Sequence, residues 1–184
     1  MIIPLTPEQI NQSINAATTP ASRLSLALAA VHAARPRAIR HLLLDDIDLG
    51  NRRLTIAGHQ RPLDELTRRL LIEWLEHRRS RWPTSANPYL IVNQQTAMST
   101  RPVSVNWMAE TFRGLAAPLE ALRVDRQLDE ALTHGPDPLH LSVVFGLDPT
   151  TAIRYAAAAQ RHLTAALECQ DPATSHEPKE PDRP

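Results

Sequence analysis

Residues 135–155 read GPDPLHLSVVFGLDPTTAIRY, and this stretch contains two helix boundaries in close succession. Its first glycine ends one predicted helix, and the short helix that follows closes at Gly146. Asp148 then caps a last helix, which we predict to run to about residue 167. The spacing fits a helix-turn-helix in which Tyr155 packs inward from the second helix.

Most of the chain before this stretch shows the apolar spacing of amphipathic helices. We predict helices over residues 6–17, 22–34, 36–44, 64–82, 103–115 and 123–134. Residues 54–56 and 61–63 have the pattern of strands and predict a small β-hairpin, and residues 89–92 are a further strand candidate. The predicted fold class is therefore mainly α (α+β), with helices around a small antiparallel β-sheet.

The length of 184 residues suits one domain, which we predict to span residues 1–168. Residues 169–184 are rich in proline and charge, and this composition predicts a disordered tail. The formal net charge is zero, but the tail holds more acidic than basic residues, so the predicted domain is weakly basic. The single lysine, Lys179, also lies in the tail, so the domain contains no lysine.

The composition argues against several classes of protein. No run of about 18 apolar residues occurs, and the first residues lack the basic start of a signal peptide, so we expect a cytoplasmic protein with no membrane partner. The one cysteine, Cys169, joins no metal or nucleophile constellation, and the histidines are scattered without HxxxH or CxxC spacing. Because a glycine-rich phosphate loop is also missing, we expect no metal and no cofactor.

Motifs near both ends of the chain share one pattern. Residues 5–10 read LTPEQI, and Arg35 stands thirteen residues before Asp48 in the run LDDID. Later in the chain, Gly146 follows the glycine of GPDP by eleven residues, and TTAIRY ends at Tyr155. Together these motifs resemble the catalytic domain of tyrosine recombinases of the phage-integrase type, although the stretch from turn to tyrosine is one residue shorter here.

The resemblance implies a role in DNA integration and recombination, with DNA as the partner and a second copy or a partner recombinase beside it on DNA. Arg35 would hold the scissile phosphate, a task that suits the bidentate geometry of a guanidinium. Arg123 or Arg126 would supply the second arginine, and the Tyr155 phenolate would attack phosphorus to form a 3′-phosphotyrosyl link. The further residues expected to contact DNA are Arg37, Arg40, His59, Arg61 and Arg154.

The sequence departs from the family pattern at positions that cleavage needs. The family places a lysine general acid on the hairpin, where residues 58–61 read GHQR and His59 is the remaining proton donor. Neither candidate for the second arginine has a histidine three residues before it, and Ala38 and Leu147 replace a glutamate and a histidine. We therefore expect cleavage to be absent or strongly impaired, since each lost transition-state donor costs on the order of 10² to 10³ in rate.

The same residues allow a second interpretation, a non-catalytic helix-turn-helix-like module that binds DNA or another protein. In that case the arginines contact the DNA backbone and Tyr155 is a packed core residue. Geometry separates the two interpretations. A recombinase needs Arg35, an arginine from residues 123–126 and the Tyr155 hydroxyl to converge on one phosphate-sized space, whereas a buried Tyr155 hydroxyl far from Arg35 favours the module.

Overall fold

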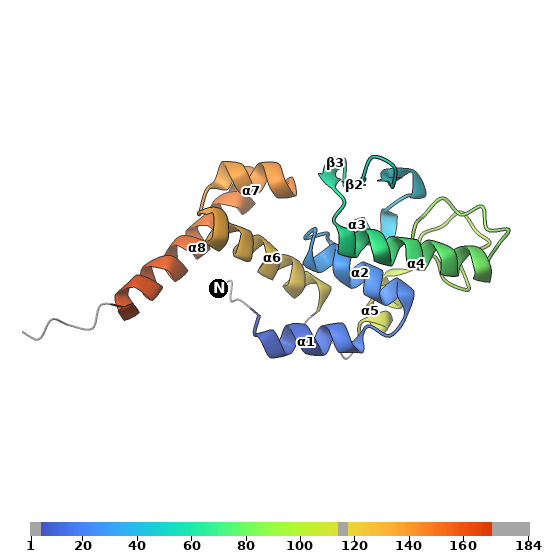
Figure 1. Ribbon diagram of the computed structural model, residues 1–184, viewed down its shortest axis with the longest axis horizontal. Coiled ribbons are helices and arrows are strands. Elements are labelled where there is room, and N and C mark those ends of the chain that lie inside the picture. The colour runs from blue at the N-terminus through green and yellow to red at the C-terminus, as the bar shows by residue number, and fades with distance from the viewer. Residues whose placement is uncertain (1–4, 114–117, 171–184) are drawn as a thin grey trace, which may run out of the picture.

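The computed structural model describes residues 5–113 and 118–170, and Figure 1 shows a mainly helical chain with one small sheet, as predicted. In chain order the elements are α1 (Pro7–Ala16), α2 (Pro20–Ala30), α3 (Pro36–His41), the 3-10 turn η1 (Leu44–Asp46), β1 (Ile47–Asp48), β2 (Arg53–Ile56), β3 (His59–Pro62), α4 (Glu65–Arg81), α5 (Val105–Thr111), α6 (Leu119–His134), α7 (Pro138–Phe145) and α8 (Pro149–Gln170). None of the helices in these ranges combines the length and the apolar character that crossing a bilayer requires.

Side-chain caps explain where several helices begin. Thr6 and Gln9 exchange side-chain-to-backbone hydrogen bonds of 3.0 and 3.3 Å at the start of α1, which forms a capping box. Asp64 before α4 and Asp148 before α8 each accept a hydrogen bond from the backbone N–H three residues on, at 2.9 and 3.0 Å. The predicted start of the last helix is confirmed, and so are both ends of α7.

Some helices end at a different residue than predicted, because backbone conformation or tertiary contacts determine where the helix stops. α2 ends four residues early, because Ala33 adopts a left-handed backbone with φ of 52°. α3 ends three residues early, because Leu44 instead donates a hydrogen bond of 2.9 Å to the carbonyl of Pro88. α8 continues to Gln170, and the rest of the predicted disordered tail, residues 171–184, lies outside the described residues.

The sheet is antiparallel in the order β1-β2-β3. The predicted hairpin is confirmed, with Ile56 paired to His59 across the β2–β3 turn. The prediction of a strand at residues 89–92 is wrong, because Tyr89 makes only an isolated bridge with Leu43 and the third strand is β1. The apolar character of residues 89–92 reflects burial of three of these side chains in the core.

Two clusters of buried apolar side chains form the interior. The larger joins α2, α4 and the sheet, and includes Leu28, Leu71 and Trp74. The smaller lies among α6, α7 and α8, and includes Phe145 and Tyr155. α6 packs against both α2 and α8, and Figure 1 shows it between the two groups of helices. α6 therefore connects the two clusters, and a site on α6 can draw residues from both.

Candidate functional site

A cavity of about 300 Å³ lies where the segment before α3, the β2–β3 hairpin, α6 and the α7–α8 turn meet. Its polar lining residues are Arg35, His59, Arg61, Arg123, Gln127 and Asp148. Three arginines and one carboxylate line the cavity, so positive charge predominates among its lining residues. This lining favours an anionic ligand with several acceptor oxygens, since guanidinium groups bind carboxylate and phosphate through paired hydrogen bonds.

Arg35 reaches the cavity from the position immediately before α3. Pro36 disfavours a helical backbone at the preceding residue, and Arg35 accordingly is extended, with φ of −71° and ψ of 147°. The residue is exposed, and it also lines a neighbouring cavity of about 420 Å³ together with Arg37 and His41. Arg35 therefore lies on the rim of the site, in contact with solvent.

Arg123 lies deeper, with 6% of the residue exposed. Its Nε donates to Glu120 Oε1 at 3.1 Å, a terminal nitrogen donates to the same oxygen, and Nη1 donates to Gln127 Oε1 at 2.9 Å. Burial would lower the pKa of Arg123, but the hydrogen bond and charge of Glu120, together with Tyr155, raise it above its usual value. Arg123 is thus a fixed cation whose direction is set by neighbours on its own helix.

Tyr155 is on α8 and contacts Arg123, with only 5% of the residue exposed. Burial raises the pKa of its hydroxyl, while the charge of Arg123 and a hydrogen bond from Arg123 oppose that rise. The phenol is therefore protonated near neutral pH and needs a base before it can act as a nucleophile. Its ring packs in the smaller apolar cluster with Leu128 and Leu141.

A recombinase needs both arginines and the Tyr155 hydroxyl in one space, whereas the non-catalytic module does not. The structure meets this requirement only in part. Arg35 and Arg123 line one cavity, and the Tyr155 hydroxyl contacts Arg123, so all three groups belong to one neighbourhood. Tyr155 itself, however, is not among the residues that line the cavity. The two arginines line the cavity, where they can bind an anion, whereas the phenol is buried and contacts Arg123 without lining the cavity.

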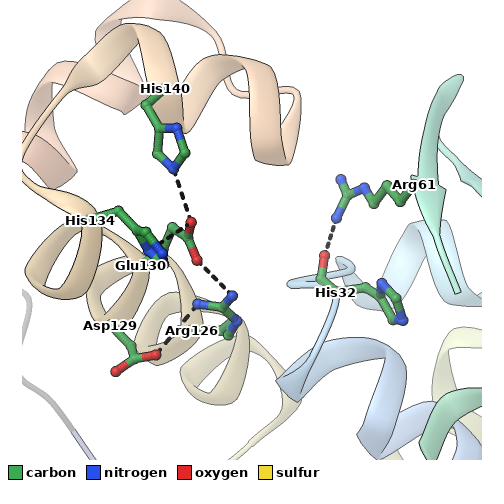
Figure 2. A network of polar contacts seen from close by, with 7 residues as sticks. All are labelled: His32, Arg61, Arg126, Asp129, Glu130, His134 and His140. Atoms are coloured by element: carbon green, nitrogen blue, oxygen red, sulfur yellow. Dashed lines mark hydrogen bonds and ion pairs between the residues drawn. The ribbon is translucent and has the colours of Figure 1, made fainter. Parts of the chain in front are cut away.

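Arg126, the other candidate for the second arginine, is not among the residues that line the cavity. Its guanidinium donates to Glu130 Oε2 at 2.7 Å and to Asp129 Oδ2 at 3.4 Å, and both contacts are drawn in Figure 2. The same group lies over the Phe145 ring, 5.6 Å from the centroid. Arg123 and Arg126 are three residues apart on α6, and only Arg123 lines the cavity.

The hairpin contributes two residues with different settings. His59 lies against the α7–α8 turn, where a Cβ on Gly146 would come within 2.4 Å of the imidazole. Arg61 points inward and donates to the carbonyl of His32 (Figure 2). It also donates to the carbonyl of Phe145, at 3.0 Å. Burial lowers the pKa of Arg61, and its Nε lacks a hydrogen-bond partner among the described residues. The hairpin therefore closes over the site from one side.

The remaining predicted DNA contacts lie outside this cavity. Arg37 is exposed and lines the neighbouring cavity, and Arg154 is exposed on α8. Arg40 is half-buried, and its Nε donates to the carbonyl of Val103 at 2.8 Å, so it holds the segment before α5. Of these three, the two exposed arginines are accessible to a large ligand such as a nucleic acid.

Sequence reasoning missed the residues that orient Arg123. Glu120 and Gln127 stand three positions before and four positions after it on α6, spacings at which helical side chains meet. The missed signal was therefore present in the sequence. Asp148 was predicted as a helix cap, and its place in the cavity wall became evident only from the fold.

The arrangement of helices and sheet is the catalytic-domain fold of tyrosine recombinases. The crystal structure of XerA recombinase matches it with a TM-score of 0.71 and 18% identity, over 91% of this chain and 66% of that chain. XerH site-specific recombinase bound to palindromic difH substrate matches with a TM-score of 0.70 and 16% identity, over 92% of this chain and 53% of that one. The Tn1549 transposon integrase in complex with transposon right end DNA matches with a TM-score of 0.62 and 14% identity, over 91% of this chain and 67% of that one.

These likenesses concern the fold. No protein-family model matches the sequence, and no curated protein matches it. The chain spans between 53% and 67% of the lengths of the three matched chains, so it corresponds to one part of each.

Proposed function

We propose that this chain is a tyrosine recombinase-like DNA-binding protein of DNA integration and recombination, in which cleavage is absent or strongly impaired. The observation that carries the proposal is the shared cavity. Arg35 and Arg123, which come from different parts of the sequence, line one positively charged space, and Arg123 contacts Tyr155. Two of the similar structures, XerH and the Tn1549 integrase, contain bound DNA, which supports DNA as the ligand.

A backbone phosphate in the cavity would take hydrogen bonds from both arginines. Arg123 offers a preset direction, because Glu120 and Gln127 already hold its guanidinium. Arg35 is exposed on the rim and adjusts to the ligand at a cost in side-chain entropy. The exposed Arg37 and Arg154 would add contacts to neighbouring phosphates, and such contacts position DNA without reading its sequence.

Cleavage would require more than these contacts supply. The Tyr155 oxygen must lose a proton and form a bond to phosphorus, while the bond from phosphorus to the 5′ oxygen breaks and that oxygen gains a proton. Burial raises the pKa of Tyr155, which opposes the first requirement. Residues 1–168 contain no lysine, so the second falls to His59, which is exposed at the hairpin turn and packed against Gly146.

DNA binding is tested by fluorescence anisotropy of a labelled duplex across a range of salt concentrations. Arg35→Ala and Arg123→Ala should each weaken binding and reduce the slope of log affinity against log salt by about 1, as expected for one lost phosphate contact. Arg81→Ala, at the far end of α4, is the matched control and should leave the slope unchanged. Equal slopes in all four proteins would contradict the assignment of the cavity to DNA phosphate.

The chain is also proposed to act beside a second copy or a partner recombinase on DNA. Residues 1–168 are only weakly basic, so a single copy should bind weakly. Cooperative binding supports this arrangement, seen as a higher affinity and a steeper binding curve on DNA with two sites than on DNA with one site. Identical affinity for one-site and two-site DNA at every concentration opposes it.

Cleavage is tested with a suicide DNA substrate that traps the covalent intermediate. We expect at most a faint covalent protein–DNA band, removed by Tyr155→Phe. Efficient strand transfer that Tyr155→Phe abolishes would contradict the impairment and would make His59 the next residue to test as proton donor.

The non-catalytic module remains a second candidate, favoured by one observation. Tyr155 is 5% exposed and packs in the core between α6, α7 and α8, as a structural residue would. Under this reading no covalent band forms, and Tyr155→Phe binds DNA as the natural chain does. A covalent band of any intensity that depends on Tyr155 decides against it.

A further inference from the structure

Outside the cavity, α6 and α7 bring together three groups that commonly bind metals. Glu130 and His134 lie one helical turn apart on α6, and His140 lies in the first turn of α7. Figure 2 shows both imidazole rings directed at the Glu130 carboxylate. His134 Nδ1 lies 3.2 Å and His140 Nε2 lies 2.9 Å from Glu130 Oε1, and the three ligand atoms are all within 4.8 Å of one another.

We propose that Glu130 Oε1, His134 Nδ1 and His140 Nε2 form a binding site for Zn²⁺. Neutral imidazole nitrogen and carboxylate oxygen are typical zinc ligands, and three protein ligands with one open position are a common coordination set. At zinc bond lengths of about 2.0–2.1 Å, neighbouring ligand atoms of a tetrahedral site are about 3.3 Å apart, so two of the three separations already suit the ion.

The connection between the two helices produces this spacing. α6 ends at His134, and Gly135 follows with φ of 98°, a conformation that residues with a side chain rarely adopt. α7 then begins at Pro138, so five residues separate the two histidines, a spacing also found between zinc-binding histidines. A search of the sequence for HxxxH or CxxC pairs passes over this combination, since the carboxylate and the turn complete it.

The neighbours of Glu130 orient its carboxylate toward the two histidines, and the histidines are accessible to an ion from solvent. The Glu130 side chain is 8% exposed, and Arg126 binds its other oxygen, Oε2, at 2.7 Å, which leaves Oε1 facing the rings. Hydrogen-bonded partners of this kind orient ligating carboxylates in metal sites. The side chains of His134 and His140 are 58% and 37% exposed, which gives an ion and a water ligand access.

A bound ion would fix the C-terminal end of α6 to α7. Phe145 ends α7 and Gly146 follows it in the cavity wall, so the site would stabilise that wall. This inference is independent of the proposed function, because it requires neither DNA nor Tyr155.

The test is calorimetric titration of the full chain with ZnCl₂ after removal of metal by a chelator. We expect saturable binding of one ion at this site, and His134→Ala and His140→Ala should each weaken it at least about tenfold, the lower range seen when supporting residues of metal sites are changed. His77→Ala, an exposed histidine on α4, is the control and should bind as the natural chain does. The visible absorption of bound Co²⁺ should report nitrogen and oxygen ligands. It should disappear in a variant that carries both His134→Ala and His140→Ala.

The possible results are easily separated. Zinc binding that is equal in all variants would place the ion elsewhere in the chain and overturn the proposal, and so would a natural chain that binds none. His134→Ala changes an exposed side chain at a helix end, so it should keep its helical circular dichroism even if substitutions at the buried Glu130 do not. A loss of zinc binding in a folded His134→Ala protein, with normal binding in His77→Ala, supports the site.

Discussion

Gly146→Ala is a sharp test of how the hairpin meets the α7–α8 turn. The residue has φ of 62°, and an added Cβ would lie 2.4 Å from His59 Cδ2 and 2.5 Å from His59 Nε2. A left-handed backbone costs a residue with a side chain about 1–2 kcal/mol. Displacing the imidazole removes its packing against the turn, for which we expect about 0.5–1 kcal/mol more because His59 is exposed. The expected destabilisation is therefore about 1.5–3 kcal/mol.

Gly58→Ala supplies a matched control for the backbone cost. Gly58 has φ of 80°, but nothing lies within 4 Å of its added Cβ, so only the conformational cost of about 1–2 kcal/mol applies. Urea denaturation gives both values as changes in midpoint at constant m. His59→Ala should recover part of the loss in Gly146→Ala and none in Gly58→Ala. Equal destabilisation of the two glycine variants, with no coupling between residues 59 and 146, would refute the close contact.

The remaining predictions concern Tyr155, His32 and salt. Tyr155→Phe should leave the free energy of unfolding nearly unchanged, whereas Tyr155→Ala should lower it by roughly 2–4 kcal/mol through loss of a buried ring; equal losses in urea denaturation would contradict this. Burial lowers the pKa of His32 despite the opposing charge of Asp64. The unfolded chain therefore binds a proton that the folded chain does not as pH falls below 6.5, the ordinary pKa of a histidine. Stability should therefore fall with pH from about 6.5 down to the lowered pKa, and His32→Gln should flatten that part of the curve. DNA binding should weaken steeply with salt in anisotropy measurements, and affinity that is unchanged between low and high salt would exclude phosphate contacts as its source.

Much of the fold follows from local signals in the sequence. The helix starts depend on caps such as Asp148, and the ends of α7 depend on Pro138 and Gly146, which act within a few residues. β1 was not predicted, since a strand of two residues acquires its identity only by pairing with β2. Residues 89–92 have the composition of a strand, but they do not join the sheet. They are buried against α4 instead, where Trp74 donates a hydrogen bond to the carbonyl of Leu90.

The candidate site was predictable in part. Motif spacing selected Arg35 and Tyr155 as candidates, and Arg35 does line the cavity, but the choice between Arg123 and Arg126 required the direction of each side chain around α6. Partners on the same helix determine those directions. Glu120 and Gln127 hold the Arg123 side chain, and residues 129 and 130 hold that of Arg126. The depth of Tyr155 and the meeting of Arg35 with Arg123 depend on how the two apolar clusters are joined, which local spacing does not encode.

Arg61 sets the outline of the cavity. Its planar head bridges the carbonyl of His32, beside the larger apolar cluster, and the carbonyl of Phe145, at the end of α7. A guanidinium directs its donors along fixed lines, whereas an ammonium on a flexible stem imposes no such angle. The position of the hairpin against the end of α7 thus depends on one rigid plane at Arg61 as well as on the contact between His59 and Gly146, so a flexible ammonium at position 61 would not hold the cavity in this shape.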